Sequence, residues 1–535
     1  MWITSKFNKL LIRLPFVVAV VVVSGFSAQS LILNIISPSE VATALSIHSI
    51  TADHGPTVGG NTVTITGDFG IPDIPLNIVQ MVTGADHAIT LDSEGRIFAW
   101  GSNWGGQLGN GVNFDSNVPV EVDMTGVLAG RDIVQIAAGN GSSFALDSEG
   151  RIFAWGSNWE GALGNGTNII SNNVPVEVDT SGVLAGRRIV QIATTWHYTL
   201  VLDSEGNIFA WGQNNNGQLG NNTNISSNVP VEVDMTGVLA GRDIVQIVAG
   251  GSHSLALDSE GRMFAWGSNS SGELGNGTFS FFGSNVPVEV DMTGVLAGRN
   301  IVQIAAGGNH SFALDSEGRI FAWGINWGGQ LGNGVNFDSN VPVEVDMTGV
   351  LAGRNIVQVM AGVAHSLAID NEGQVFSWGL NMEGSLGNGV NFDSNVPVEV
   401  DMTGVLAGRN IVQVMAGWHS SFAIDSEGNV FAWGDNSFGQ FGNNTNMSSN
   451  VPVVITNFGQ GLVNSLELSV TLGNLPCTDV RIINSNTITC IVPAHPAGTV
   501  DVVVNTLHGS TTLYQGYTYI DIPDVPNTGH YRVRN

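Results

Sequence analysis

Positive charge is scarce in this sequence. Its 535 residues contain 17 lysines and arginines against 45 aspartates and glutamates, which gives a formal net charge of −28. Nucleic acids and anionic membrane surfaces repel such a chain, so neither is expected as a partner. Charged residues of both signs make up only 12% of the sequence, which is too few for a disordered acidic tail. We therefore expect a folded protein.

Catalytic motifs are also missing. The sequence has no glycine-rich phosphate loop, no nucleophile elbow and no paired-cysteine metal motif. Two segments, residues 103–131 and 326–354, are identical letter for letter. An active site needs unique residues in asymmetric positions, which near-identical segments do not offer. We expect a protein that is not an enzyme and that has no cofactor.

What the sequence has instead is a repeat that ends in Phe-Ala-Trp-Gly, written Phe-Ser-Trp-Gly in the sixth copy. Successive tryptophans of this motif follow one another at steps of 55, 56, 55, 57, 55 and 55 residues. A period of this size indicates stacked units, each of which buries apolar faces against its neighbours. The seven framework tryptophans are Trp100, Trp155, Trp211, Trp266, Trp323, Trp378 and Trp433.

Each repeat unit contains four short extended segments separated by turn-forming residues, and no helical periodicity. Two of the segments are apolar on both faces, which predicts strands that are covered on both sides. Pro342 cannot donate a ladder hydrogen bond, so the last segment suits an edge strand. Four strands in each of seven units predict an all-β fold with a seven-bladed β-propeller. In one unit the expected strands are residues 301–306, 311–315, 319–323 and 341–345.

The pattern G-x-x-H-S-x-A-L-D-x-x-G-x-[IV]-F-x-W-G-x-N-x-x-G-x-L-G-N-G describes the unit. It resembles the repeat of the regulator of chromosome condensation family, whose members form seven-bladed propellers. The resemblance covers residues 75–459, and its many fixed positions make it specific. It implies the propeller fold and a scaffold for binding.

Histidine fills one column of this pattern in four of the seven units. Equivalent positions on neighbouring blades are about 10 Å apart, whereas one zinc ion needs its ligands at about 2 Å. We therefore expect no metal there, and a hydrogen bond from each histidine within its own blade. The Asp-Ser-Glu-Gly-type turns lack the dense carboxylate spacing of a calcium loop. The column contains His87, Ser142, Tyr198, His253, His310, His365 and Ser420.

Alternating strand patterns also flank the repeats, in residues 45–70 and 466–520. The first segment resembles the opening of an IPT/TIG domain, an immunoglobulin-like sandwich, and the second resembles its remainder. Neither is long enough for a two-sheet core, whereas together they approach the size of a small sandwich. The ends of a propeller lie close together, so one loop can hold it. We expect one sandwich that carries the propeller in a loop.

Residues 1–44 have the order of an export signal: basic residues, an apolar run and small residues. Cleavage is expected near residues 42–44, or near residues 25–27. An uncleaved membrane anchor is the alternative, although polar residues interrupt the apolar stretch. Either form places the protein outside the cell or on its surface.

Only two cysteines are present, Cys477 and Cys490, on what should be nearby strands of the sandwich. In an exported protein an isolated pair is more typical of a disulfide than of a metal site. The sequence therefore predicts a Cys477–Cys490 disulfide, with two unpaired thiols as the alternative.

Five tryptophans lie outside the framework motif and outside the export segment. Three of them occupy one loop position, where other units have asparagine, serine or methionine. The other two come just before a histidine in the turn after the first strand. Large aromatic side chains on loops of a rigid scaffold are favoured anchors for a partner. Filling small gaps between blades is the alternative. The candidate binding residues are Trp104, Trp159, Trp196, Trp327 and Trp418.

Three functions fit these observations. The first is a secreted or surface-displayed protein that binds another protein through the propeller face; the resemblance includes secreted propellers that inhibit β-lactamases. The second is a carbohydrate-binding adhesin, because exposed tryptophans also stack on sugar rings. The third is guanine-nucleotide exchange, the activity for which the family is named, and the export segment argues against it.

The chain ends in residues 521–535, which we expect to be disordered. They include Val-Pro-Asn-Thr-Gly at residues 525–529, which resembles a sortase sorting pentapeptide. No apolar segment separates this pentapeptide from the basic residues that follow. A wall-anchoring signal without its tail and an ordinary polar terminus are both open.

Overall fold

The computed structural model describes residues 45–51, 53–68, 78–455, 468–484, 487–506 and 509–520. The expected export segment and the sorting-like pentapeptide lie outside these residues. The described part is all-β, without an α-helix, and forms a propeller and a sandwich. Three short 3₁₀-helices interrupt the propeller loops: η1 (Trp159–Gly161), η2 (Gly294–Leu296) and η3 (Met382–Gly384).

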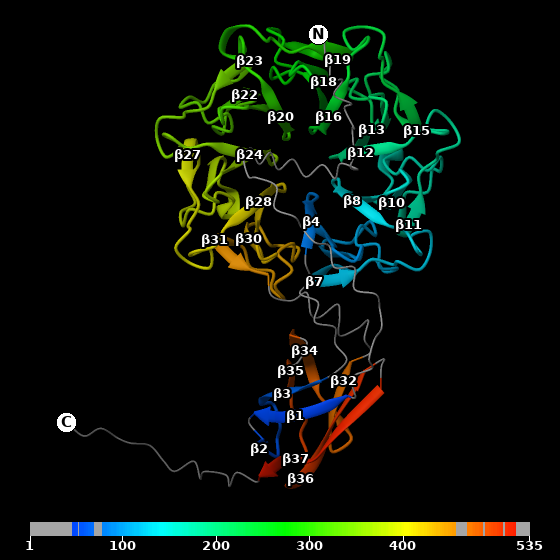
Figure 1. The fold of residues 1–535 in the computed structure, drawn as a ribbon, viewed down its shortest axis with the longest axis vertical. Coiled ribbons are helices and arrows are strands. Elements are labelled where there is room, and N and C mark those ends of the chain that lie inside the picture. The colour runs from blue at the N-terminus through cyan, green and yellow to red at the C-terminus, as the bar shows by residue number, and fades with distance from the viewer. Residues whose placement is uncertain are drawn as a thin grey trace, which may run out of the picture.

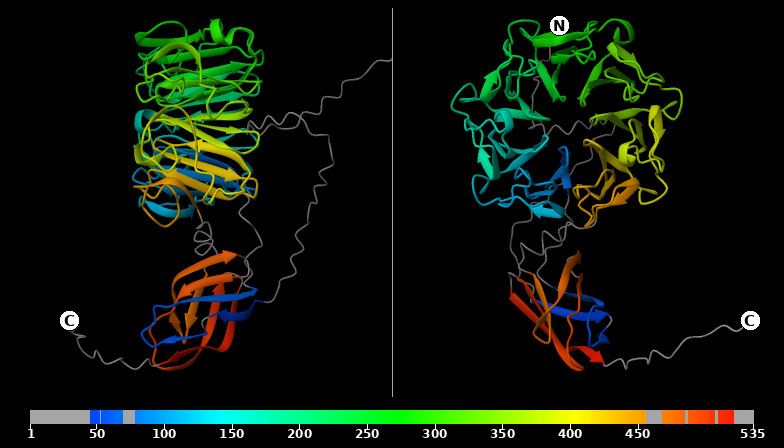
Figure 2. Two further views of the ribbon diagram at one scale, coloured as in Figure 1. Left: turned by 90° about the vertical axis from the view of Figure 1, so that its left-hand side faces the viewer. Right: turned by 180° about the vertical axis from the view of Figure 1, so that it is seen from behind.

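The propeller consists of seven four-stranded antiparallel sheets, or blades, set radially around an axis (Figure 1). The first strand of each blade lies nearest the axis and the fourth lies at the rim. Seen from the side, the blades form a disc (Figure 2). The first four blades are β4 (Ile78–Thr83), β5 (His87–Asp92), β6 (Ile97–Gly101) and β7 (Ser116–Glu121); β8 (Ile133–Ala138), β9 (Ser142–Asp147), β10 (Ile152–Ser157) and β11 (Ser171–Glu177); β12 (Ile189–Thr194), β13 (Tyr198–Asp203), β14 (Ile208–Gly212) and β15 (Ser227–Glu232); β16 (Ile244–Ala249), β17 (His253–Asp258), β18 (Met263–Asn269) and β19 (Ser280–Glu289). The last three are β20 (Ile301–Ala306), β21 (His310–Asp315), β22 (Ile320–Gly324) and β23 (Ser339–Glu344); β24 (Ile356–Ala361), β25 (His365–Asp370), β26 (Val375–Gly379) and β27 (Ser394–Glu399); β28 (Ile411–Ala416), β29 (Ser420–Asp425), β30 (Val430–Gly434) and β31 (Ser449–Val454).

Burial follows the pattern of the repeat. Every residue of β21 and β22 is buried, because neighbouring blades cover both faces of the middle strands. The fourth strand β23 pairs only with β22 and is half-exposed. Its Pro342 therefore lies on an edge strand, as the sequence predicts. The expected strand bounds of this unit agree with the observed ones to within two residues.

Each framework tryptophan joins its blade to the one before it. The indole Nε1 of Trp378, for example, donates a hydrogen bond of 2.9 Å to the carbonyl of Gln330 in the preceding blade. Gly332 approaches the same indole so closely that a Cβ there would lie 2.7 Å from Nε1. All seven junctions contain the equivalent bond, including that of the last blade with the first, from Trp100 to the Gln440 carbonyl.

The column histidines also bond to the neighbouring blade, so the expectation of a bond within their own blade is wrong. Nε2 of His87 lies 3.0 Å from the hydroxyl of Ser143 in the next blade. His253, His310 and His365 make the equivalent contact. The side chain stands between two closely packed sheets, and the nearest polar partner belongs to the other sheet.

The sandwich is built from strands on both sides of the propeller in the sequence. Strand β3 pairs with β35 over five residues, with Val63 opposite Cys490. Asn61 donates to the hydroxyl of Tyr517, 456 positions away, at 2.8 Å. One sheet has the order β1 (Ser46–Thr51), β3 (Thr62–Asp68), β35 (Thr487–Ile491) and β34 (Thr478–Asn484). The other has the order β2 (His54–Pro56), β37 (Gly509–Ile520), β36 (Gly498–Thr506), β32 (Ser469–Leu472) and β33 (Leu475–Pro476).

The two cysteines do not form the predicted disulfide in this structure. Cys477 and Cys490 are free and buried within the apolar core of the sandwich. A hydrogen bond between the two side chains and burial both raise the pKa of the Cys490 thiol. In an apolar core reduced thiols act as small hydrophobic side chains. Here the two thiols are also joined by a hydrogen bond.

Candidate binding face

The two faces of the propeller differ in which loops they present. In every antiparallel blade, one end carries the turn between the first and second strands and the turn between the third and fourth strands. We call this end the upper face. The other end, which we call the lower face, carries the hairpins between second and third strands and the connections between blades.

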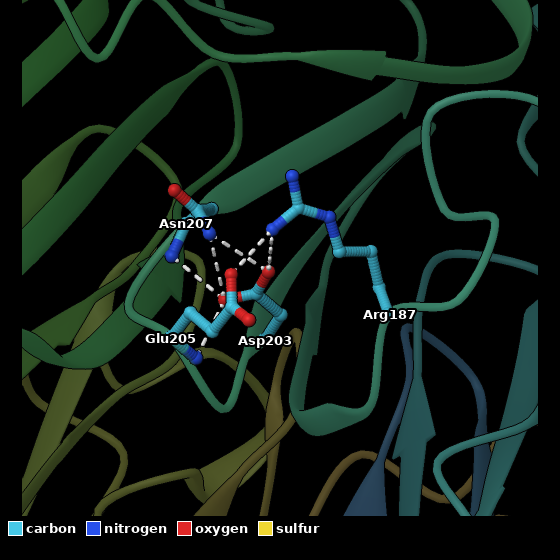
Figure 3. A network of polar contacts seen from close by, with 4 residues as sticks. All are labelled: Arg187, Asp203, Glu205 and Asn207. Carbon is cyan, nitrogen blue, oxygen red and sulfur yellow. Dashed lines mark hydrogen bonds and ion pairs between the residues drawn. The ribbon is translucent and has the colours of Figure 1, made fainter.

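Ion pairs hold the lower face together. In the third blade, Arg187 donates to Asp203 Oδ2 at 3.1 Å and to Glu205 Oε2 at 2.8 Å (Figure 3). Asp203 is buried, and its other oxygen accepts the backbone N–H groups of Glu205 and Asn207. The arginine also covers the ring of Phe209, 5.6 Å from its centroid. The Asp-Ser-Glu-Gly-type turns are thus structural. Within the described residues, no group of three or more histidines, cysteines or carboxylates is placed to hold a metal ion.

Ion pairs of this kind involve ten of the eleven arginines of the propeller, and the eleventh, Arg188, donates to the carbonyl of Ser148. No lysine follows Lys9 in the sequence. Every arginine between residues 78 and 455 lies in a lower-face hairpin or in a connection between blades. The upper-face loops therefore contain no lysine or arginine. The arginines are Arg96, Arg131, Arg151, Arg187, Arg188, Arg242, Arg262, Arg299, Arg319, Arg354 and Arg409.

The upper-face loops contain carboxylates instead. Asp86 is half-buried, and burial raises its pKa to about 6, with smaller contributions from the charges of Asp435 and Asp115. No arginine or lysine is close enough to offset these charges. The acidic residues of these loops are Asp86, Asp115, Glu160, Glu273, Asp338, Glu383, Asp393 and Asp435.

All five candidate tryptophans lie on the upper face, in two separate sets. Trp104, Trp159 and Trp327 follow the third strands of their blades and are 66%, 61% and 60% exposed. Most of the surface of each of these three side chains is accessible to a partner. Trp196 and Trp418 are half-buried in turns after first strands.

Trp196 and Trp418 meet across the propeller axis. They come from the third and seventh blades, yet their ring centroids lie 6.2 Å apart in an edge-to-face arrangement. Both line a central channel of about 340 Å³, together with the first strands of all seven blades. Six of the seven glutamines of these strands, such as Gln135, are hydrogen-bonded to the neighbouring blade. Trp196 and Trp418 are the aromatic side chains among the described residues that line this channel.

The structure adds a ring of apolar side chains that the sequence analysis missed. In each blade, the residue five positions before the proline of the fourth strand is large, apolar and 74–85% exposed. The signal was present as a column of the repeat, but the alternation of phenylalanine, isoleucine and methionine concealed it. We call these residues the rim residues: Phe114, Ile170, Ile225, Phe282, Phe337, Phe392 and Met447.

The loops that present the rim residues are held by a buried asparagine. In the fifth blade, Asn326 donates to the carbonyls of Val335 at 2.8 Å and Phe337 at 3.1 Å. Its Oδ1 accepts the backbone N–H of Leu331 at 2.9 Å. Fixing a loop before binding lowers the entropy that association removes, which suits an apolar contact surface.

Comparison with known proteins identifies the fold family. An RCC1-like domain model matches residues 111–352, and RCC1 repeat models match within residues 356–440. The Ultraviolet-B receptor UVR8 of Arabidopsis thaliana is 30% identical over 71% of this chain and 82% of its own length. The chain belongs to the RCC1-repeat propeller family. An IPT/TIG domain model matches residues 443–519.

Solved structures with a similar fold agree. Human WBSCR16 is similar in fold, with a TM-score of 0.60 at 23% identity, over 74% of this chain and 99% of that one. Prp20p of Saccharomyces cerevisiae gives a TM-score of 0.56 at 25% identity, over 65% of this chain and 82% of that one. The Prp20p structure was described with its binding to Gsp1p and histones. RCC1-like propellers thus mediate interactions with other proteins.

Proposed function

We propose that this chain is an exported, non-enzymatic protein that captures a protein partner on the upper face of its propeller. The observation that carries the proposal is the ring of seven exposed apolar rim residues beside Trp104, Trp159 and Trp327. Aromatic anchors on a rigid scaffold are the residues that contribute most to protein interfaces. Each of the seven blades exposes one rim residue on this face, in addition to the three tryptophans.

The proposed location rests on the sequence of residues 1–44, with its basic, apolar and small-residue order. No helix in the described ranges is both long and apolar enough to span a membrane. We further propose that the IPT/TIG-type sandwich is split, with the propeller inserted between β3 and β32.

The test is a comparison of two triple variants of the mature protein. Replacing Trp104, Trp159 and Trp327 by serine should weaken capture of the protein partner at least tenfold, because aromatic anchors contribute about 2 kcal/mol or more each. Unfolding free energy should change by less than about 2 kcal/mol, since these side chains are mostly exposed. The matched control replaces the lower-face residues Val127, Val183 and Val405 by serine and should bind normally.

Binding that survives the tryptophan variant would remove the upper face from the interaction. The second candidate, a carbohydrate-binding adhesin, is favoured by the same exposed indoles, which also stack on sugar rings. A glycan array with the same variants distinguishes carbohydrate binding from protein binding. Tryptophan-dependent capture of a glycan, with no protein partner present, would favour the adhesin.

A further inference from the structure

The junction between the third and fourth blades departs from the repeat and contains a pocket on the upper face. The pocket lies between the loop that follows β14 and the start of β19, in neighbouring blades (Figure 1). Its volume of about 530 Å³ falls within the range of about 300–1,000 Å³ that is usual for small-molecule sites. The lining residues are Asn215, Asn216, Asn224, Phe281, Phe282, Gly283, Ser284 and Asn285.

The fourth blade supplies the aromatic side of this pocket. The step from its framework tryptophan to the next is 57 residues, the longest in the repeat. The added residues extend β19 to Ser280, which pairs with Asn269 of β18. Phe281 and Phe282 follow; they are 88% and 85% exposed and meet edge to face, with 5.6 Å between their ring centroids. Gly283 lets the extended strand approach β18, because a Cβ there would overlap a carbonyl oxygen of β18.

The third blade supplies amides. Asn224 connects the two sides: its Oδ1 accepts from Nδ2 of Asn285 at 3.0 Å, and its own Nδ2 donates to the carbonyl of Asn215 at 3.3 Å. Within the described residues, the side-chain amides of Asn215 and Asn216 have no hydrogen-bond partner. No other blade has two asparagines at this place in the loop. Both sides of the pocket are therefore additions that the repeat itself does not need.

The lining of the pocket selects a class of ligand. None of the described residues that line it is charged, so the pocket offers no counter-ion to an ionic ligand. A primary amide both donates and accepts hydrogen bonds, as a hydroxyl group does. An exposed aromatic ring offers a flat apolar surface beside these amides. A ligand that uses both sides needs several hydroxyl groups and one apolar face.

We propose that this pocket binds a neutral saccharide, with Asn215 and Asn216 bonded to its hydroxyl groups and Phe281 packed against the C–H face of its ring. A pyranose ring presents both kinds of surface in one rigid molecule. A free saccharide and the terminal sugar of a protein-linked glycan share this chemistry. Trp104, Trp159 and Trp327 do not line the pocket, so this site is independent of the proposed capture of a protein.

The experiment measures saturation-transfer NMR of the mature protein with the methyl glycosides of glucose, galactose, mannose and N-acetylglucosamine, one at a time. The matched probe is sorbitol, which has the hydroxyl groups without a ring. We expect at least one glycoside to bind at least about tenfold more tightly than sorbitol, because its ring is rigid before binding. Failure of all four glycosides, or equal binding of sorbitol, would overturn the proposal.

Single variants locate the site. Asn215→Ser and Asn216→Gly introduce residues that other blades have at these positions, and Phe281→Ser removes the exposed ring. Each should weaken binding of the responsive glycoside at least about fivefold, as loss of one hydrogen bond or apolar contact does. The matched control is Phe114→Ser, at a rim residue of the first blade that is 80% exposed, and it should leave saccharide binding unchanged.

A loop exchange separates this proposal from the proposed function. Replacing residues 278–283 by residues 335–338 of the fifth blade removes the insertion and Phe281 but keeps a phenylalanine at the rim position. This variant should keep its melting temperature and its protein capture and lose the glycoside. If it still binds the glycoside, or if binding is lost only in the Trp104, Trp159 and Trp327 variant, the pocket is not the site.

An immobilised glycoprotein that ends in the responsive sugar distinguishes the two sources of the ligand. Capture by the wild type but not by the loop-exchange variant assigns the pocket to protein-linked glycans. Binding of the glycoside alone, without such capture, assigns it to free saccharides. Capture by both proteins alike would place glycan binding elsewhere and contradict the proposal.

Discussion

At the scale of single residues, the repeat places polar groups where they connect neighbouring blades. Six of the seven junctions contain a glutamine whose amide both donates to and accepts from the backbone of the next blade, such as Gln303 with Val359. The column histidines add a bond to a serine of the next blade. These hydrogen bonds form only when neighbouring blades pack against each other, so they favour one arrangement of the blades.

The first prediction concerns His310. Burial lowers the pKa of this histidine to about 3, with smaller contributions from His253 and His365. Between pH 6.5 and about 3 the unfolded chain binds a proton at this residue and the native chain does not. The contribution of His310 to the unfolding free energy is therefore fully present above pH 6.5 and is lost as the pH falls towards 3.

His310→Ser introduces the residue that the second and seventh blades have in this column. At pH 7 it should lower the unfolding free energy by about 1–3 kcal/mol, through a lost hydrogen bond and a small cavity. At pH 5 the deficit should be about 2 kcal/mol smaller, because the variant lacks the proton linkage. Urea unfolding at both pH values measures this difference, and a deficit independent of pH would contradict it.

At the scale of elements, the loop between the third and fourth strands is the functional part of each blade. A buried asparagine at its start fixes the backbone, and the exposed rim residue at its end contacts solvent. Sequence variation is concentrated at the exposed positions, such as Trp327 against Met382, while the asparagine column is constant. The scaffold and the contact surface are therefore separable within a single loop.

We predict that Asn326→Ala loosens one such loop without opening the ring. The change leaves the carbonyls of Val335 and Phe337 and the N–H of Leu331 without this partner, at a cost of about 1–3 kcal/mol. Amide hydrogen exchange in residues 327–338 should accelerate more than in the strands. Asn371→Ser is the matched control, since six blades already have serine in that exposed hairpin. Uniformly faster exchange across the propeller would contradict a local role.

At the scale of the whole molecule, the described strands close the ring without an exchange of strands between its first and last blades. The last blade contains four consecutive strands, β28 to β31. Closure instead uses the bond from Trp100 to the Gln440 carbonyl and one between Asn117 and Asn446. Among the described residues, Gln413 makes no bond of the kind that its counterparts make across the other six junctions.

The third prediction tests the sandwich. Strand β3 lies between β1 and β35, and its Val63 and Ile65 are fully buried. A chain that begins at residue 69 lacks both, and exposes the edge of β35 and the apolar core behind it. Residues 468–520 should then be cut rapidly by protease while the propeller persists.

The control for this deletion begins at residue 45 and should resist protease throughout. Resistance of residues 468–520 in the shorter chain would show that they fold alone, as the family match to residues 443–519 by itself would suggest.

The sequence by itself determined the number of blades, the strand order within each and the edge position of Pro342. These features depend on local periodicity and on a repeat that is present in seven copies. It also placed the five variable tryptophans in loops. Only the tertiary structure decided that Trp196 and Trp418 touch, since they lie in different blades and meet through the closure of the ring. It also decided that the histidines form hydrogen bonds between blades and that the rim residues lie in one ring on the upper face. All the propeller arginines lie on the lower face instead. These properties depend on the direction in which each strand leaves its sheet and on distances across an axis, which spacing along the chain does not contain.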